Sequence, residues 1–160
     1  MVPQAKPRVS RAVARRGFTL IELMITVAVV AIFSALAAPS FRQLIAQQRL
    51  KTAASALSES LWIARSEALK RNGNVSFTFT TAAAGWNIID STSTTLFQQD
   101  GFSSVTSTIK TGTGILTFSP YGRLTATGAG QIQLSNSAAD VYSCVTISTT
   151  GRTSVKAVAC

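Results

Sequence analysis

Side chains suited to acid–base or metal chemistry are scarce in this sequence of 160 residues. It contains no histidine, and six acidic residues stand against fifteen lysines and arginines. Proton transfer and metal binding usually rely on histidines and carboxylates that the fold brings together. The sequence has no nucleophile–base pair, Gly-rich phosphate loop or metal-ligand spacing. We therefore expect neither an enzyme nor a cofactor or metal site. Five carboxylates lie outside the apolar segment: Glu59, Glu67, Asp90, Asp100 and Asp140.

The sixth carboxylate, Glu22, lies in the most apolar stretch of the chain. Apart from Glu22, the only residues between 18 and 38 that are not apolar are Thr19, Thr26 and Ser34. This length suffices for one helix to cross the ~30 Å hydrocarbon layer of a membrane. A carboxylate there costs roughly 2.5–3.5 kcal/mol, so it calls for a partner. The preceding residues carry no acid and five cations, which predicts a cytoplasmic N-terminus. These cations are Lys6, Arg8, Arg11, Arg15 and Arg16.

The segment Gly17-Phe18-Thr19-Leu20-Ile21-Glu22 follows the basic leader and opens the apolar run. In this arrangement it resembles the processing site of type IV pilins and pseudopilins. The resemblance implies that prepilin peptidase cleaves after Gly17 and that the new N-terminus, Phe18, becomes N-methylated. It also implies that Glu22 pairs with the amino terminus of a neighbouring subunit in a filament.

Two other interpretations of the N-terminus compete with this resemblance. A secretory signal could end at Ala35-Leu36-Ala37, which has the A-x-A pattern of signal-peptide cleavage. However, Glu22 would interrupt its apolar segment, and the helical pattern continues past that point. A plain membrane anchor would explain the span and the charges, but not Gly17 or Glu22.

A second, amphipathic stretch of helix follows the apolar run. Apolar residues recur at helical spacing in one stripe: Leu50, Ala53, Ala54, Leu57, Leu61, Ala64 and Ala68. Glu67 precedes Arg71 by four residues, a spacing that favours an ion pair. Asn72-Gly73-Asn74 predicts a left-handed C-cap. Pro39 lies where the two stretches meet and predicts a kink or local break, because it removes a backbone donor.

After Asn74 the apolar period changes from that of a helix to that of a strand. Short segments separated by turn residues predict strands at 75–80, 86–89, 102–109, 115–118, 123–125, 132–134, 142–148 and 153–158, with a loop at 91–100. Their length and spacing predict an antiparallel sheet that buries the helical stripe. The expected fold is α+β, a type IV pilin-like lollipop with a long N-terminal helix packed on an antiparallel β-sheet domain. We divide the chain into a cleaved leader (1–17), a transmembrane and filament-core half-helix (18–38), an amphipathic half-helix (39–72) and a β-rich globular part (73–160).

Internal motifs narrow the resemblance to minor subunits of the FimT/FimU and GspH group. They are Trp62-Ile63-Ala64-Arg65-Ser66-Glu67-Ala68, Phe118-Ser119-Pro120-Tyr121-Gly122-Arg123, and Val145-Thr146-Ile147-Ser148 followed by Gly151-Arg152. The resemblance implies three alternative roles. FimU-like subunits help to prime type IV pilus assembly at the tip, GspH-like subunits belong to the pseudopilus of type II secretion, and FimT-like subunits bind DNA for natural transformation.

The DNA-binding role depends on cations near the C-terminus. FimT-like proteins use a Gly-Arg-x-Arg element, which here reads Gly151-Arg152-Thr153-Ser154, with serine in place of the second arginine. Lys156 shares a strand face with Arg152, ~13 Å along the strand. Arg123 and Lys110 would extend this patch if the fold brought them close. Such binding to double-stranded DNA would depend on phosphates and weaken steeply with salt.

Location and partners follow from the same resemblance. We expect a single-pass protein of the bacterial inner membrane with a periplasmic C-terminal domain, later part of a cell-surface pilus. Its partners would be major and minor pilin subunits, prepilin peptidase, the membrane before assembly and, in the FimT-like role, DNA. In an oxidising periplasm, Cys144 and Cys160 would form a disulfide that fixes the C-terminus. Two free thiols are the alternative.

Overall fold

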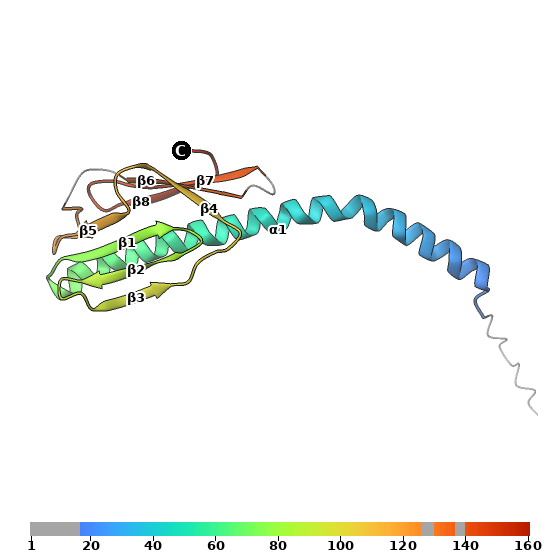
Figure 1. Cartoon of the computed structure of the whole chain (residues 1–160), viewed down its shortest axis with the longest axis horizontal. Coiled ribbons are helices and arrows are strands. Elements are labelled where there is room, and N and C mark those ends of the chain that lie inside the picture. The colour runs from blue at the N-terminus through green and yellow to red at the C-terminus, as the bar shows by residue number, and fades with distance from the viewer. Residues whose placement is uncertain (1–16, 126–129, 137–139) are drawn as a thin grey trace, which may run out of the picture. The chain divides into compact units, whose positions relative to one another are not determined.

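A computed structural model describes residues 17–125, 130–136 and 140–160 of the chain. Within these residues one long helix precedes eight strands (Figure 1). The helix is α1 (Leu20–Arg71), and the strands are β1 (Val75–Thr81), β2 (Gly85–Asp90), β3 (Thr95–Gln99), β4 (Thr106–Thr111), β5 (Ile115–Phe118), β6 (Gly130–Asn136), β7 (Val141–Ile147) and β8 (Thr153–Lys156). The expected fold class, a long N-terminal helix with an antiparallel β domain, is confirmed.

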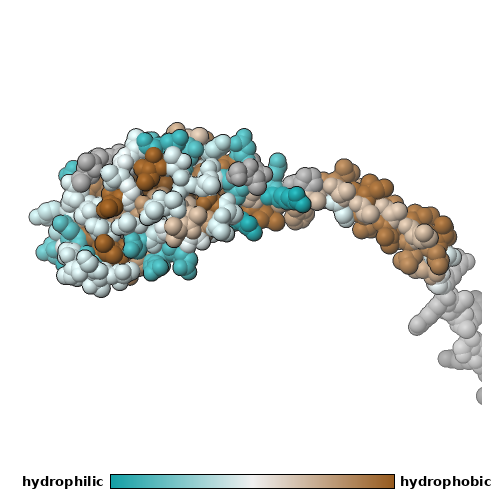
Figure 2. Space-filling model, viewed as in Figure 1, coloured by the Kyte–Doolittle hydropathy of each residue, from teal (hydrophilic) through white to brown (hydrophobic). Residues whose placement is uncertain are grey.

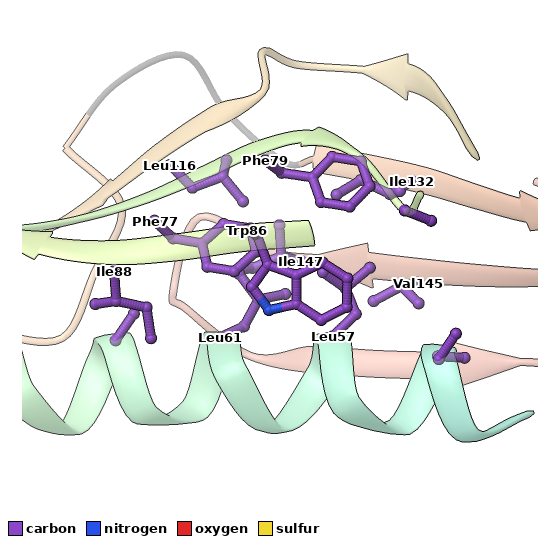
Figure 3. Close-up of a cluster of buried hydrophobic side chains, with 14 of the residues drawn as sticks. Leu57, Leu61, Phe77, Phe79, Trp86, Ile88, Leu116, Ile132, Val145 and Ile147 are labelled. Atoms are coloured by element: carbon purple, nitrogen blue, oxygen red, sulfur yellow. The ribbon is translucent and has the colours of Figure 1, made fainter. Parts of the chain in front are cut away.

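The second part of α1 packs on the strands through the stripe that the sequence predicts. All seven of its members are buried: Leu50, Ala53, Ala54, Leu57, Leu61, Ala64 and Ala68. Leu57 and Leu61 point into a core that both sheets complete (Figure 3). From the sheets this core takes Phe77, Phe79, Trp86, Ile88, Leu116, Ile132, Val145 and Ile147, among others. Because alanines line much of the stripe, the strands approach the helix closely while the larger side chains fill the space between leucines.

The strands form two sheets rather than the single sheet expected. Sheet A has the order β3-β2-β1-β5 and sheet B the order β4-β6-β7-β8. The strand pairings within both sheets are antiparallel. One long helix with a broad apolar stripe can cover two short sheets, and short strands leave each sheet too small to bury the stripe alone. The alternation of apolar residues predicts where strands form, but it does not predict which sheet each strand joins.

Three strand predictions were wrong in detail. Residues 95–99, expected in a loop, form β3, and the strand expected from Phe102 begins only at Thr106. The segment expected at 123–125 contributes a single bridge, between Leu124 and Phe118. The β2–β3 connection explains the first error. Asp90 accepts hydrogen bonds from the backbone N–H groups of Thr92 and Thr94, both at 2.9 Å, which closes a tight turn and returns the chain as a strand.

The end of α1 has the C-cap predicted for it. Asn72 adopts a left-handed conformation with φ of 48°. Its N–H donates to the carbonyl of Leu69 at 3.4 Å, and the N–H of Gly73 donates to that of Ala68 at 3.2 Å. This pair of bonds is the Schellman arrangement, which satisfies carbonyl groups of the last turn. The helix therefore ends where β1 must begin.

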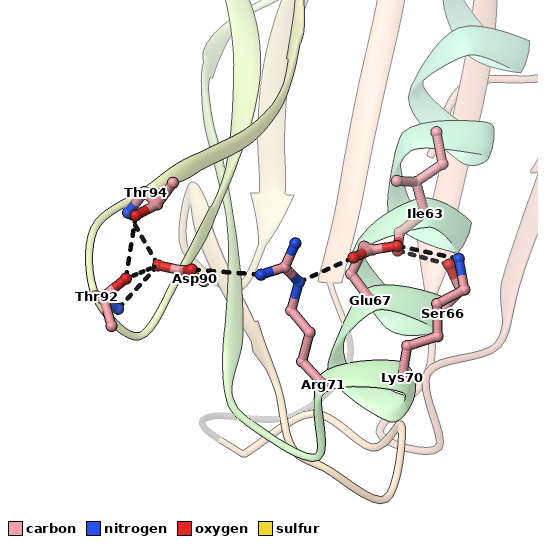
Figure 4. Close-up of polar contacts among 8 residues, drawn as sticks. All are labelled: Ile63, Ser66, Glu67, Lys70, Arg71, Asp90, Thr92 and Thr94. Carbon is pink, nitrogen blue, oxygen red and sulfur yellow. Dashed lines mark hydrogen bonds and ion pairs between the residues drawn. The ribbon is translucent and has the colours of Figure 1, made fainter.

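An ion-pair cluster joins the end of α1 to sheet A (Figure 4). Arg71 contacts Glu67 at 3.0 Å and Asp90 at 3.7 Å, and Lys70 contacts Glu67 at 3.1 Å. The Glu67–Arg71 pair predicted from the sequence is thus confirmed. Hydrogen bonds from Arg71 and then Lys70 lower the pKa of Glu67. The pKa of Asp90 is lowered mainly by the hydroxyl of Thr92 and then by the backbone N–H of Thr94.

Candidate functional site

The first turn of α1 holds the carboxylate of Glu22. The backbone N–H and the hydroxyl of Thr19 donate to Glu22 Oε2 at 3.0 and 3.1 Å, and the N–H of Glu22 donates to Thr19 Oγ1 at 3.3 Å. This reciprocal pattern is a capping box, which satisfies donors at the start of a helix. Glu22 was predicted to need a partner, but Thr19 was not predicted to be one, although the spacing Thr-x-x-Glu is the known signal for such a box.

The helix surface that follows is apolar and exposed. Figure 2 shows the N-terminal part of α1 as hydrophobic surface. Its exposed large side chains include Leu20, Ile21, Leu23, Met24, Ile25, Val27, Val30, Ile32, Phe33 and Leu36. A surface of this kind is stable only where lipid or another protein covers it. In the described residues no single helix has the length and hydropathy of a membrane span, whereas the bent pair Leu20–Leu36 and Ser40–Arg71 passes on length and composition.

The break in this pair falls at residues 37–39. The chain also divides into two compact units there, one ending at Ala38 and the other extending from Pro39 to Cys160. The kink at Pro39 remains a prediction, as do the functions assigned to the segments on either side. The leader up to Arg16 lies outside the described residues.

The outer face of sheet B, which points away from α1, is polar. Inward residues such as Ile132, Leu134, Val145 and Ile147 are buried, so their neighbours in sequence point outward. Strand register aligns these outward residues in two rows across all four strands. One row is Thr108, Gln133, Cys144 and Lys156, and the other is Thr111, Gln131, Thr146 and Ser154. Neither row contains a carboxylate.

Three of the four cations predicted to bind DNA gather at the β8 side of sheet B. Lys156 is the last residue of β8 and lies on the outer face. Arg152 directly precedes β8, two residues before the outward-pointing Ser154. Both side chains are exposed at this edge. Arg152, Thr146 and Gln131 line one shallow groove of about 490 Å³. Lys110 is exposed on β4, at an irregularity in its pairing with β6. It therefore lies three strand spacings from β8, or ~14 Å.

Arg123 reaches this edge through a turn that duplicates the turn before Arg152. Both turns read Ser-x-x-Gly-Arg, at residues 119–123 and 148–152. In each, the glycine N–H donates to the serine carbonyl at 2.8 Å, and the serine N–H donates to the arginine carbonyl at 2.8 and 2.9 Å respectively. The glycines have φ of 69° and 74°, in the left-handed region that glycine favours. We call these two segments the paired turns.

The paired turns lie side by side on α1. A Cβ atom at Gly151 would overlap the carbonyl oxygen of Gly122, and the N–H of Leu124 donates to the carbonyl of Thr149 at 3.0 Å. Arg65 of α1 lies against both turns and donates from Nη1 to the carbonyl of Gly151 at 3.4 Å. Both Gly-Arg motifs are visible in the sequence, but the contact of Arg65 with both turns could not be predicted from it.

The C-terminus is fixed to the outer face of sheet B. Cys144 and Cys160 form the predicted disulfide, with Cα atoms 5.0 Å apart. The N–H of Cys160 also donates to Gln133 Oε1 at 3.1 Å. The disulfide covers Cys144, which is buried although its row points outward. The alternative of two free thiols is therefore excluded.

Among the described residues no cluster of three His, Cys, Asp or Glu side chains could hold a metal ion. The two functional arrangements are an acidic N-terminal turn on an apolar helix, and arginines and a lysine beside a polar sheet face. The first suits assembly with other apolar helices, and the second suits a partner with negative charge.

Two family models match the chain. The family model described as type II transport protein GspH matches residues 53–151, and the prokaryotic N-terminal methylation motif matches residues 13–38. The first match covers the helical stripe from Ala53 onward and the first of the paired turns, and it ends at Gly151 in the second. The second covers the capping box and the apolar run. No curated protein matches the sequence.

Known structures share the fold. The type IV minor pilin FimU of Pseudomonas aeruginosa has a TM-score of 0.59 and 25% identity, with 67% of this chain and 92% of that chain covered. A second crystal form of FimU gives a TM-score of 0.60 and 24% identity over 69% and 90% of the two chains. The minor pseudopilin EpsH of the Vibrio cholerae type 2 secretion system gives 0.56 and 12% identity over 68% and 97%.

Proposed function

We propose that this chain, which belongs to the family of type II transport protein GspH, is a minor pilin of a type IV pilus, inserted near the tip to support assembly. At the coarser level it is a minor pilin or pseudopilin, and its family consists of structural subunits rather than enzymes. The observation that favours the pilus is the likeness to FimU, at 25% identity over 92% of that protein. The alternative is a GspH-like subunit of type II secretion. EpsH, a minor pseudopilin of a type 2 secretion system, shares the fold of this chain.

Maturation of this subunit would follow from its methylation motif. Prepilin peptidase would cleave after Gly17, and Phe18 would be methylated. The capping box supports a role for Glu22 in assembly, because Thr19 holds the carboxylate beside the new amino terminus. The protein would lie in the inner membrane with its C-terminal domain in the periplasm, and then enter a surface pilus beside major and minor pilins.

Mass spectrometry of surface filaments tests both steps. Filaments sheared from wild-type cells should contain a peptide that begins with N-methylated Phe18. A strain lacking the type II secretion machinery should retain it, whereas a strain lacking the type IV pilus motor should lose it. The opposite pattern would support the pseudopilus, and a peptide that retains Gly17 at its N-terminal side would contradict processing.

We further propose that the outer face of sheet B binds double-stranded DNA without sequence preference, for natural transformation. The observation that supports this is the cluster of Arg152, Lys156 and Arg123 beside rows without a carboxylate. Phosphates accept hydrogen bonds from hydroxyl, amide and guanidinium groups, and these contacts position a protein on DNA. Thr146, Ser154 and Gln131 supply such donors between the cations.

Fluorescence anisotropy of a labelled duplex over a salt series tests this proposal. Binding by residues 39–160 should weaken linearly on a log–log plot, with a slope of about −0.9 per phosphate contact. Arg152→Ala and Lys156→Ala should each lower affinity and reduce the slope by about one contact. Arg49→Ala, which removes an exposed arginine from α1, is the matched control. Equal effects of all three substitutions, or no binding at low salt, would contradict a site on sheet B.

A further inference from the structure

The flank of α1 beside the paired turns exposes large side chains that the core does not use. Trp62 is 62% exposed and Leu69 50% exposed, and Tyr121, in the first of the paired turns, is 83% exposed. The other tryptophan, Trp86, is buried in the core at 4%. Neither the helical stripe nor the outer face of sheet B includes these three side chains. Their exposure therefore requires a separate explanation.

Helix geometry and turn packing bring these residues together. Trp62, Arg65 and Leu69 are spaced by three and four residues, so they follow one another along one side of α1. A Cβ atom at Gly122 would lie 3.0 Å from Arg65 Nε and 3.3 Å from Leu69 Cδ1. The first of the paired turns thus rests on this side of the helix, with Tyr121 and Arg123 on either side of the contact. We call these five residues the arginine–aromatic patch.

The accessible positive charge of the patch is Arg123, which is exposed. Arg65 Nε, by contrast, is buried against the paired turns and cannot reach a partner protein. The ion pairs found within the described residues are formed by Lys70 and Arg71, and not by Arg65 or Arg123. No member of the patch is acidic. A complementary surface would therefore present carboxylates around an apolar centre.

The residue types favour a protein as the occupant. Tryptophan, tyrosine and arginine are enriched at the hot spots of protein interfaces, where they lie in desolvated centres. Leu69 adds an aliphatic surface that a phosphate backbone cannot match. The rows of hydroxyl and amide groups that suit phosphates lie on sheet B, whereas Trp62, Arg65 and Leu69 of the patch lie on α1. A filament subunit must also contact its neighbours outside the apolar helix, through a surface of this kind.

We propose that the arginine–aromatic patch docks an acidic surface of a neighbouring pilin-type subunit in the assembled filament. The proposal rests on the proposed function as a filament subunit. It adds the contact face and the chemistry of its partner. Trp62 and Tyr121 enter the apolar centre of the interface, and Arg123 meets carboxylates at its edge.

Photo-crosslinking in cells that assemble the full chain tests this contact. The probe is p-benzoylphenylalanine, placed in turn at Trp62, at Tyr121 and, as a control, at Ile115, an exposed apolar residue of β5. With the probe at Trp62 or Tyr121, we expect crosslinked products that contain peptides of another protein with its own methylation motif. With the probe at Ile115, these products should be absent. Crosslinks to DNA, no crosslink, or equal products at the control position would overturn the proposal.

Substitutions separate this proposal from the function on which it rests. In sheared filaments, Trp62→Ala and Arg123→Glu should be depleted about tenfold relative to wild type, whereas Ile115→Ala should be retained. Thermal unfolding of each variant provides the check on folding. If wild type is absent from filaments, the proposed function itself fails. If wild type is present and Trp62→Ala and Arg123→Glu are retained equally, only the docking face is wrong.

Discussion

The contact between the paired turns makes Gly151 a position where a very small substitution should have a large effect. Gly151 has φ of 74°, and an added Cβ would overlap the carbonyl oxygen of Gly122 and lie 3.3 Å from Arg65 Nε. An alanine in the left-handed region costs about 1–2 kcal/mol. Displacing a packed backbone to admit a methyl group costs about 1–3 kcal/mol more. Gly151→Ala should therefore lower the free energy of unfolding by about 3 kcal/mol.

Gly73→Ala is the matched control. A Cβ at Gly73 would meet only the carbonyl oxygen of Arg71, at an ordinary distance of 3.8 Å. Its effect should lie within about 1 kcal/mol of zero, since alanine also reduces the freedom of the unfolded chain. Urea unfolding of residues 39–160, followed by circular dichroism, compares the two variants. Their difference should exceed about 2 kcal/mol by this reasoning, and equal stability would refute the close contact between the paired turns.

Three further predictions concern the rest of the β domain. Cys160→Ser should destabilise it by about 3 kcal/mol, because the disulfide closes a loop with a sequence separation of 16; an unchanged urea midpoint would contradict this. Leu57→Ala should lower the free energy of unfolding by about 3 kcal/mol, because Leu57 is fully buried. Leu44→Ala, at an exposed position, should lower it by less than about 0.5 kcal/mol. Thermal unfolding curves that coincide for the two variants would exclude the packing of α1 on the sheets. The pKa values of Glu67 and Asp90 are lowered, so their contribution to folding stability is present above the ordinary carboxyl pKa of about 4 and is lost as pH falls through the lowered values. The urea midpoint should therefore stay constant from about pH 7 to 5 and fall below about pH 4. A main loss of stability between pH 7 and 5 would count against this assignment, since the chain has no histidine.

The helix could be predicted from the sequence because its signals are local. The stripe from Leu50 to Ala68 repeats at helical spacing over five turns, and Asn72 provides the C-cap. The division of the strands into two sheets could not be predicted, because alternation defines the faces of a strand and not its partners. β3 was missed because its sequence, Thr95-Leu96-Phe97-Gln98-Gln99, follows a Ser/Thr-rich turn whose Asp90 closure needs the fold to be recognised.

The candidate sites show the same contrast. Gly17, Phe18 and Glu22 lie within one six-residue motif, so their roles can be predicted from the sequence alone. Arg65, by contrast, acquires its role only when turns 119–123 and 148–152, far from it in sequence, pack on α1. The repeat Ser-x-x-Gly-Arg was visible in the sequence, but only the shared hydrogen bonds show that it forms two equivalent turns.

The most direct test of this account is the amount of the chain in surface filaments when Glu22 is replaced. Cells should express wild type or Glu22→Ala at equal levels, and quantitative mass spectrometry should compare sheared filaments with membranes. Wild type should be present in filaments and Glu22→Ala should be depleted at least about tenfold, as loss of a buried ion pair worth more than about 1.4 kcal/mol requires. The variant should remain in the membrane with its disulfide formed. Equal amounts of both proteins in filaments would contradict assembly through the N-terminal helix.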